Sequence, residues 1–353
     1  MGIYFITILL AYTSAWIAQK VYVNRLNKQE VSINKFFVFL TASILVFVAG
    51  TRWGVGTDYW QYALNYNKYI ETVGIAILNF DEPGIYLLAK ISSLIYDDYT
   101  SMFFVSSAIT ISLIIRTISK YSNMFALSIL LFIFMGFWHG SFNGIRQYLA
   151  CAILFAGHRY IIDRKLIKYI FVVFAASAFH TTALVMFFLY FVPIKKIGIK
   201  QIILISIGSI ALLYSYNFVF SFIEALRGRP VSSILYITND VTVFRVAVMF
   251  APILVYFFLT SKNKLDNNDM FYINLLFINA ALMLGTSGSA YLARLSIYTN
   301  IFATLAFPRL LYIQDKYLEF IIRSLIIFLY AIFWYIDVSG SNTLSNFQWI
   351  FNR

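Results

Sequence analysis

The chain of 353 residues is 61% hydrophobic and 12% charged, with a mean hydropathy of +0.78. A soluble domain is about half apolar and about a quarter charged, so this composition excludes an ordinary soluble protein and indicates a polytopic membrane protein. The single cysteine, Cys151, excludes an intrachain disulfide and a cysteine-built metal site.

Twelve apolar segments predict membrane spans. About 20 apolar residues cross a bilayer, and shorter segments suffice where they end in a polar cavity. We expect residues 1–353 to form a single all-α transmembrane domain, with outer-face loops at residues 51–82 and 223–240. The predicted spans lie near residues 2–19, 34–51, 101–118, 124–138, 143–161, 166–179, 181–193, 201–222, 241–260, 270–287, 291–307 and 318–337.

The basic residues of the short connections predict the orientation, because lysine and arginine concentrate on the cytoplasmic side of a membrane protein. One set of connections holds 18 of the 27 basic residues and six of the 15 acidic residues, and we expect it to be cytoplasmic. The other face then carries both termini and is nearly neutral. The net charge of +12 lies on the inner face, where anionic lipid accounts for it without a nucleic-acid partner.

Residues 83–96 do not fit a simple span under this orientation. A crossing here would place Asp97 and Asp98 on the cytoplasmic side and the next basic residues outside. We therefore expect a re-entrant or interfacial helix on the outer face, begun by Pro83 in its first turn.

The apolar stretch 166–193 has basic residues at both ends. A single crossing would place one basic end outside, which the orientation disfavours. Two short spans that meet at His180 keep both ends inside and put His180 on the outer side. One continuous tilted helix is the alternative.

Polar residues that interrupt apolar runs fall on the expected outer face. Arg146, Arg245 and Arg294 each lie about a turn into an apolar helix, where a charge is costly and normally faces a cavity or a partner. Arginine suits phosphate because its planar fork donates two hydrogen bonds at once, so the three predict a shared anionic ligand. The full outer-face set is Arg52, Asp58, Asp81, Glu82, His139, Arg146, His180, Arg227, Arg229, Asp240, Arg245 and Arg294.

These residues also have purely structural interpretations. Arg245 can pair with Asp240, and Arg146 can extend to the membrane interface. Asp58 can cap the helix that follows it, and Glu82 can be an acid at the start of its own helix. A buried histidine often serves packing alone.

No motif of a soluble enzyme is present. The segment "GVGTDY" lacks the Gly-Lys-Ser/Thr that completes a phosphate-binding loop. The sequence also lacks a DxD pair of the kind that holds a metal-bound sugar nucleotide. A nucleotide-sugar donor is therefore not expected.

Five segments together resemble the EpsG/Wzy group of polymerases, which build bacterial exopolysaccharide and O-antigen from repeat units. The resemblance runs from about Arg52 to Arg294, and its most specific part is NxxRQxLA followed by AxxFHxTA. The segments are "RWGVGTDYWQY", "DEPGIYLLAKI", "NGIRQYLACAILFAGHRYI", "AFHTTAL" and "VTVFRVAV".

The resemblance implies a glycosyltransferase of the GT-C-like, multi-spanning architecture, with about 12 transmembrane helices in the bacterial inner membrane. Such an enzyme transfers the growing glycan from undecaprenyl diphosphate to the non-reducing end of a new repeat unit at the outer leaflet. The expected partners are that lipid-linked oligosaccharide and membrane lipid, with a chain-length regulator protein as a candidate and no nucleic acid. No cofactor, nucleotide or metal is expected. The product is O-antigen, capsule or exopolysaccharide.

The implied chemistry assigns roles to the outer-face residues. Positive charge must neutralise the departing diphosphate, and we expect this from Arg146, Arg245 and Arg294, with Arg52 in reserve. The acceptor hydroxyl needs a group that takes its proton, and the candidates are His180, Glu82 and Asp58, with His180 favoured because a neutral imidazole accepts a proton near pH 7. Two further expected substrate-binding residues are Tyr59, in the aromatic-rich loop 51–82, and Asn143, of the NxxR segment.

Two alternative functions stay open. A lipid-linked oligosaccharide flippase or other transporter also has many spans and intramembrane arginines, but it predicts internal repeats and polar residues in both leaflets. A glycan ligase shares the chemistry and the outer-face site, but such ligases usually carry a larger periplasmic loop than residues 223–240.

Overall fold

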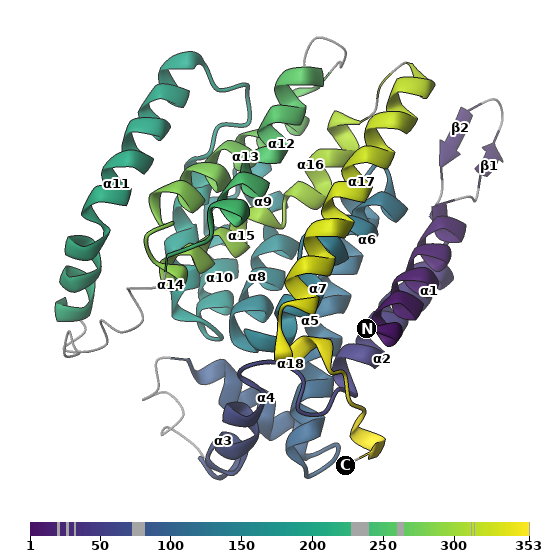
Figure 1. Ribbon diagram of the computed structural model, residues 1–353, viewed down its shortest axis with the longest axis vertical. Helices are drawn as coiled ribbons and strands as arrows, with labels where there is room; N and C mark the ends of the chain where they lie inside the picture. The colour runs from purple at the N-terminus through teal and green to yellow at the C-terminus, as the bar shows by residue number, and fades with distance from the viewer. Residues whose placement is uncertain are drawn as a thin grey trace. The chain divides into compact units, whose positions relative to one another are not determined.

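The computed structural model describes residues 1–19, 22–25, 28–31, 33–72, 82–226, 240–259, 265–311, 313 and 315–352. Within these ranges the chain is helical, as an all-α fold requires, except for one short antiparallel hairpin formed by β1 (Tyr22–Arg25) and β2 (Lys28–Val31). Figure 1 shows the helices in chain order from purple to yellow. The expected outer-face residues Asp81, Arg227 and Arg229 lie outside the described ranges.

The chain divides into two compact units, which are described separately. Unit 1 comprises Met1–Tyr190 and Asp315–Arg353, and unit 2 comprises Phe191–Gln314. The helices of unit 1 are α1 (Gly2–Gln19), α2 (Lys35–Gly50), α3 (Tyr59–Glu71), α4 (Pro83–Ser93), α5 (Tyr99–Tyr121), α6 (Phe125–Phe134), α7 (Phe137–Asn143), α8 (Ile145–Gly157), α9 (Arg159–Ile162), α10 (Leu166–Ser177), the 3₁₀ helix η2 (Thr181–Phe191), α17 (Lys316–Ser339), α18 (Asn342–Ser345) and η5 (Ile350–Asn352). Unit 2 contains α11 (Ile199–Leu226), α12 (Val243–Leu259), α13 (Asn267–Gly285), α14 (Ala290–Ala293), η4 (Arg294–Ser296), α15 (Ile297–Asn300) and α16 (Ala303–Leu310).

Three helices of the described chain, α1, α5 and α17, are each long and apolar enough to cross a membrane, and the bent pair of α6 and α7 is a fourth. Seven further apolar helices are 10–17 residues long over their described parts. The fold is therefore that of a membrane-embedded helical protein. The number of twelve spans and the GT-C-like architecture stay predictions.

Small side chains bring α1 and α2 close together in unit 1. Ala11, Ala15 and Ala18 are fully buried on α1, and small residues allow helix backbones in a membrane to approach closely. The Thr41 hydroxyl on α2 donates to the Ser14 hydroxyl of α1 at 3.1 Å, and Ser14 donates to the Phe37 carbonyl. This polar contact fixes the register of the two helices without leaving a buried hydroxyl unpaired.

Two helix breaks lie in unit 1, one inside a predicted span and one where two short predicted spans meet. The segment near 124–138 bends by 42° between α6 and α7, at Gly136, whose φ of +91° favours glycine. The stretch 166–193 is interrupted between Ser177, where α10 ends, and Thr181, where η2 begins. The alternative of one continuous helix is therefore wrong, and His180 lies in the break.

The C-terminal tail lies beside the loop from Thr51 to Asp58, at the end of unit 1 that carries α3 and α4 (Figure 1). The Trp53 N–H donates to the Gln348 carbonyl, and the Ile350 N–H donates to the Thr51 carbonyl, both at 2.9 Å. The Tyr4 hydroxyl donates to the Leu344 carbonyl at 2.8 Å. The C-terminal tail thus lies across the loop that precedes α3.

The turn before α3 depends on a glycine. Gly56 has a φ of +113°, and a Cβ at this position would lie 2.7 Å from the Phe142 carbonyl oxygen. The neighbouring Thr57 N–H donates to Asn143 Oδ1 at 2.8 Å. Only glycine therefore allows the loop to approach the α7–α8 junction this closely.

In unit 2, α13 packs against α11, α12 and α16. A buried polar network joins α13 to α15, in which Thr299 donates to Asn279 Oδ1 at 2.9 Å and Asn279 donates to Asn300 Oδ1 at 3.3 Å. The predicted span 291–307 is not one helix, because α14, η4, α15 and α16 divide it.

Candidate active site

The carboxylate of Glu82 joins three separate elements of unit 1. Its Oε1 lies 2.6 Å from His180 Nδ1, in the break after α10, and accepts the Thr181 N–H at 3.0 Å. Its Oε2 accepts a hydrogen bond from Arg146 Nη1, on the first turn of α8. Glu82 itself is 8% exposed. These residues, together with Tyr62, form what we name the Glu82 cluster.

The sequence around Glu82 explains how α4 can begin at this point. Pro83 occupies the first helical turn, where its missing N–H costs nothing. The Gly84 N–H donates to the Ala178 carbonyl at 2.7 Å. A Cβ at Gly84 would lie 2.8 Å from that carbonyl oxygen and 2.7 Å from the Phe179 ring, so a larger residue would push α4 away from α10. The glycine thereby brings Glu82 within reach of His180.

The break between α10 and η2 supplies two groups to the same oxygen of Glu82. His180 contributes its ring, and Thr181 contributes a backbone N–H at the first position of η2, where helical N–H groups lack partners within the helix. Because an ionised carboxylate only accepts hydrogen bonds, the proton of His180 lies on Nδ1. When the ring carries this proton alone, its Nε2 atom is an acceptor, and Nε2 has no hydrogen-bond partner among the described residues.

Arg146 is held on one side and open on the other. Its Nε donates to the Tyr62 hydroxyl of α3 at 3.2 Å, and its guanidinium carbon lies 5.8 Å from the Tyr62 ring centre. Nη1 is bound to Glu82, whereas Nη2 has no partner within the described part of the chain. The side chain is 37% exposed, so the free edge of the guanidinium can receive an anionic oxygen.

The electrostatics of the Glu82 cluster keep the carboxylate ionised. Burial alone raises the pKa of Glu82, but the hydrogen bond and charge of His180, the charge of Arg146 and the Thr181 N–H together outweigh burial and hold the pKa below its usual 4.5. The carboxylate therefore orients the imidazole and stabilises positive charge on it, rather than acting as the strongest base of the cluster.

Arg52 does not join the cluster. It is 1% exposed, and its guanidinium carbon lies 5.0 and 4.9 Å from the ring centres of Phe103 and Phe142. Its nitrogens donate to the carbonyls of Ala49, Val55 and Phe142 and to the Ser107 hydroxyl. The structure thus uses Arg52 to join α2, α5 and α7, which leaves its guanidinium no free edge for a substrate.

Tyr59 and Asn143 have packing and loop contacts. The Tyr59 ring is fully buried and stacks on Phe103 with ring centres 4.2 Å apart. Asn143 holds the Thr57 N–H through Oδ1. Both residues support the position of α3, and through it the position of Tyr62 in the Glu82 cluster.

Asp58 lies at the N-terminal boundary of α3, one helical turn before Tyr62. Its carboxylate makes no capping hydrogen bond, so the expected cap is wrong, although the helix that it precedes is present as Tyr59–Glu71. Asp58 shares a face of α3 with Tyr62, since residues four apart lie one above the other. It thus lies on the side of α3 from which Tyr62 contacts Arg146.

Arg245 and Arg294 belong to unit 2. Arg245 lies in the first turn of α12, and Arg294 begins η4 directly after α14. Both side chains are exposed. Their neighbours Val246 and Ala293 pack against the same hydrophobic cluster, around Met249 and Met283, so the two arginines lie on adjoining elements of this unit.

Sequence reasoning missed three contributors to the site. Tyr62 was recognisable only as one ring among several in the loop, Thr181 contributes its backbone, and Gly84 acts by lacking a side chain. The signal for Gly84 was present in the "EPG" triplet, in which proline and glycine follow an acid. A contact between the buried His139 and the partly exposed Asp337 was also unforeseen, since His139 Nε2 lies 3.1 Å from Asp337 Oδ2.

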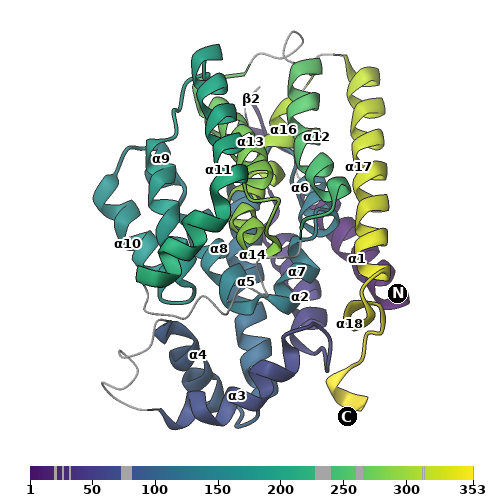
Figure 2. The ribbon, with the colours of Figure 1, turned by 60° about the vertical axis from the view of Figure 1, so that its left-hand side comes forward.

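The apolar helices define a membrane-embedded helical protein, and the Glu82 cluster is a charged site within unit 1. Figure 2 shows α3 and α4, which contribute Tyr62 and the residue before Pro83, at one end of this unit. Comparison with models of protein families gives a match to the EpsG family over residues 35–350. The chain belongs to the EpsG family, which indicates a glycosyltransferase-like polymerase of polysaccharides. No curated protein and no solved structure matches the chain.

Proposed function

We propose that the protein polymerises lipid-linked oligosaccharide repeat units at the outer leaflet of the bacterial cytoplasmic membrane. The growing glycan would pass from undecaprenyl diphosphate to the non-reducing end of a new repeat unit. Membership of the EpsG family supports the polymerase class. The observation that carries the mechanism is one carboxylate, Glu82, that holds His180 on one oxygen and Arg146 on the other.

In this mechanism His180 is the base. As the acceptor hydroxyl oxygen attacks the anomeric carbon, its proton passes to His180 Nε2, the acceptor nitrogen that Glu82 leaves free. The imidazolium that forms is stabilised by the ionised Glu82 at 2.6 Å from Nδ1. Glu82 thus fixes the tautomer and the ring orientation, a task that general-base catalysis requires of a neighbouring acid.

Arg146 is assigned to the leaving group. The bond between the anomeric carbon and the phosphate oxygen breaks, and its electron pair leaves with undecaprenyl diphosphate. The free edge of Arg146 neutralises the negative charge that develops on this oxygen, and a fixed donor is most effective where it needs no reorganisation. Arg245 and Arg294, which belong to unit 2, are proposed to bind anionic groups of the lipid-linked substrate.

Asp58 is proposed to orient the acceptor sugar from the start of α3. Tyr59 and Asn143 act on substrate indirectly, by holding α3 and the loop before it. Arg52, which the sequence suggested as a reserve ligand for the diphosphate, is assigned a structural role because its donors are all directed to protein oxygens.

Deletion of the gene followed by electrophoresis of surface glycan tests this function. A polymerase deletion leaves single repeat units and removes the ladder of longer chains. Loss of all surface glycan would instead indicate a flippase, and polymer retained on undecaprenyl diphosphate would indicate a ligase.

A further inference from the structure

Helix α4 and the turn that follows it expose one continuous row of apolar side chains. Leu87, Ile91, Leu94 and Ile95 are all exposed, and Leu94 reaches 82% exposure. Leu87 and Ile91 are four residues apart and therefore lie on one face of α4, and Leu94 and Ile95 continue the row in the turn that follows. We name these four residues the α4 stripe. Contiguous apolar surface of this kind marks a contact with a partner or with lipid.

The opposite face of α4 is part of the core of unit 1. Ile85, Leu88 and Ala89 are buried in a cluster that includes Tyr59 and Phe103. This packing fixes which side of the helix faces outward. The α4 stripe is therefore exposed because of how α4 docks onto α3 and α5, and not because the helix is loosely attached.

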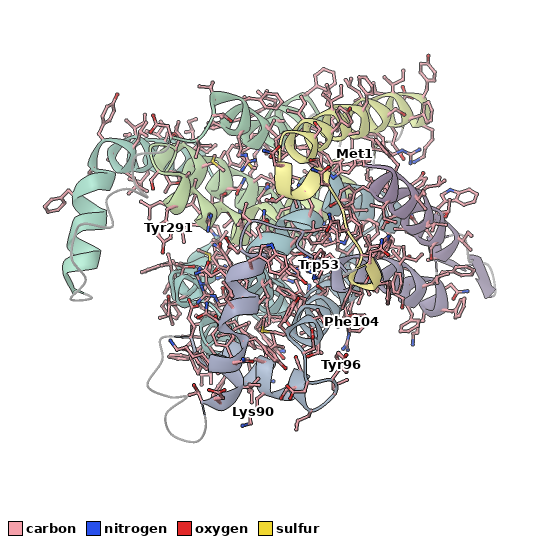
Figure 3. All side chains as sticks on the ribbon, turned by 60° about the horizontal axis from the view of Figure 1, so that its bottom comes forward. Met1, Trp53, Lys90, Tyr96, Phe104 and Tyr291 are labelled. Carbon is pink, nitrogen blue, oxygen red and sulfur yellow. The ribbon has the colours of Figure 1, made fainter. Side chains whose placement is uncertain are left out.

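The single charged side chain of α4 is turned away from the stripe. Lys90 is half-buried, and its Nζ donates to the Ile70 carbonyl near the end of α3 at 3.2 Å. Figure 3 looks onto this end of unit 1 and labels Lys90 and Tyr96. The exposed row thus carries no charge from Leu87 to Ile95, and the next exposed residues are Tyr96 and Asp97.

The position of α4 along the chain gives its depth in the membrane. With 11 residues it is about 16 Å long at about 1.5 Å per residue, too short to cross a hydrocarbon layer of about 30 Å. Four residues after Ile95, the last residue of the stripe, α5 begins at Tyr99 and runs for 23 residues, which is long enough to cross the membrane. The stripe therefore lies near the end of a spanning helix, which is where the membrane surface is, and an exposed tyrosine such as Tyr96 is typical of that level.

We infer that α4 is an interfacial helix whose stripe is covered by the acyl chains of bilayer lipid in the leaflet on the Glu82 side. An amphipathic helix that buries a row of this kind lies in the plane of the interface. A groove for one specific chain is disfavoured, because a residue as exposed as Leu94 stands on a convex surface. The position of α4 therefore fixes the level of the membrane surface relative to unit 1.

This placement sets the depth of the active site. Glu82 is the residue directly before α4, so it lies at the level of the lipid headgroups. On the function proposed above, a lipid-linked diphosphate occupies this same level and reaches Arg146 by lateral movement within the leaflet. The anchoring of α4 does not depend on that function, whereas the lateral approach of substrate does.

Fluorescence quenching by brominated lipids tests the inference. In a Cys151→Ala background, single cysteines at Ile91, Leu94 and Asp97 are labelled with bimane, and the protein is reconstituted in vesicles of phosphatidylethanolamine and phosphatidylglycerol. Bromine close to the headgroup end of the acyl chain should quench the label at Ile91 and Leu94 more strongly than bromine near the chain end. The label at Asp97 should be quenched weakly by either lipid. A cysteine at Phe328, exposed on α17, is the matched control and should be quenched best by the deep bromine.

Two results would overturn the inference. If Ile91 and Leu94 are quenched no more than Asp97 while Phe328 is quenched, the stripe is covered by protein or by water. If the deep bromine quenches Leu94 as well as it quenches Phe328, α4 enters the bilayer as a re-entrant helix. Neither measurement requires polymerase activity, so a wrong proposed function leaves this test intact. A Leu94→Glu variant that loses activity in vesicles several-fold, while Leu94→Phe keeps it, would link the anchoring to catalysis.

Discussion

Glu82 and His180 are 98 residues apart in the chain, and their side chains meet with 2.6 Å between Oε1 and Nδ1. The contact joins the start of α4 to the break between α10 and η2. It exists because Gly84 permits α4 to lie against the Ala178 carbonyl. Because Nδ1 is bound to Glu82, His180 Nε2 remains available as a hydrogen-bond acceptor. The second carboxylate oxygen, Glu82 Oε2, accepts the hydrogen bond from Arg146.

Replacement of His180 by glutamine should lower the polymerisation rate by about two to four decades, the usual range for loss of a general base. The acid limb of the rate profile should flatten, because the group whose protonation stops the reaction is gone. Rates measured against pH on purified lipid-linked repeat units provide the check. His139→Gln is the matched control, since His139 is buried outside the Glu82 cluster. If His180→Gln retains more than about a tenth of the wild-type rate, His180 is not the base and serves packing.

Glu82, Arg146 and His180 of this cluster were predictable, but their meeting was not. The charge distribution predicted which face is outside. The depth of Arg146 in an apolar helix and the position of His180 at a helix break then marked both as polar residues of that face. The sequence offered Glu82, His180 and Asp58 as rival bases, because no local pattern tells which residues of separate helices come into contact. In the structure Glu82 and His180 are partners instead of rivals.

The helices were predictable where long apolar segments determine them, as in α1, α5 and α17. Breaks within helices were harder to predict, because they depend on the backbone conformation of single residues such as Gly136. The contacts of Arg52 could not be predicted for a related reason. Its four hydrogen-bond acceptors lie on three helices and on the loop before α3, and they are mostly backbone carbonyls that the sequence does not mark.

Arg146→Lys should reduce polymerisation almost as much as Arg146→Ala. Lysine keeps the charge but lacks the planar fork, so it cannot hold Tyr62, Glu82 and an anionic oxygen together. Arg245→Lys is expected to behave in the same way if it also binds an anionic group of the substrate. Arg159→Lys serves as the control, because Arg159 forms an ion pair with Asp163 at the surface of unit 1 and is not part of the Glu82 cluster. Normal polymer from both Arg146→Lys and Arg245→Lys, at normal protein level, would reduce these arginines to interface anchors.

Arg52→Met should destabilise the protein without a specific effect on catalysis. The change leaves buried carbonyls of Ala49, Val55 and Phe142 without donors, at about 1–3 kcal/mol for each unsatisfied group. A lower midpoint of thermal unfolding in detergent, with nearly normal activity per folded molecule, is the expected result. A variant with wild-type stability and lost activity would instead indicate that Arg52 binds substrate.

The ionised state of Glu82 predicts a pH-dependent stability difference between the wild type and Glu82→Gln. The folded pKa of Glu82 lies below its ordinary 4.5, so its stabilising contribution is present above the unfolded pKa and is lost as the pH falls through the folded pKa. The wild type should be more stable by about 2 kcal/mol or more at about pH 7 and about pH 5, and the difference should shrink below about pH 4. Thermal unfolding of both proteins across this range measures it. Glu71→Gln, at an exposed position of α3, should show no such difference, and a wild-type advantage that persists in strong acid would contradict the charged cluster.

The expected orientation can be tested with single cysteines in a Cys151→Ala background. Asn67 on α3 and Lys165 before α10 are both exposed, and the distribution of basic residues places them on opposite sides. A membrane-impermeant thiol reagent added to intact cells should modify a cysteine at position 67 and spare one at position 165. The reverse pattern would place the Glu82 cluster in the cytoplasm.

Polymerisation by the purified protein tests the central claim most directly. The protein is reconstituted with a single lipid-linked repeat unit as its substrate, and both the glycan ladder and the released undecaprenyl diphosphate are measured. The account predicts that wild-type protein forms a ladder and releases one undecaprenyl diphosphate for each linkage, and that His180→Gln and Arg146→Lys lose both products together. A ladder of normal length from either variant, or a wild-type protein that binds the substrate and forms no linkage, would contradict it.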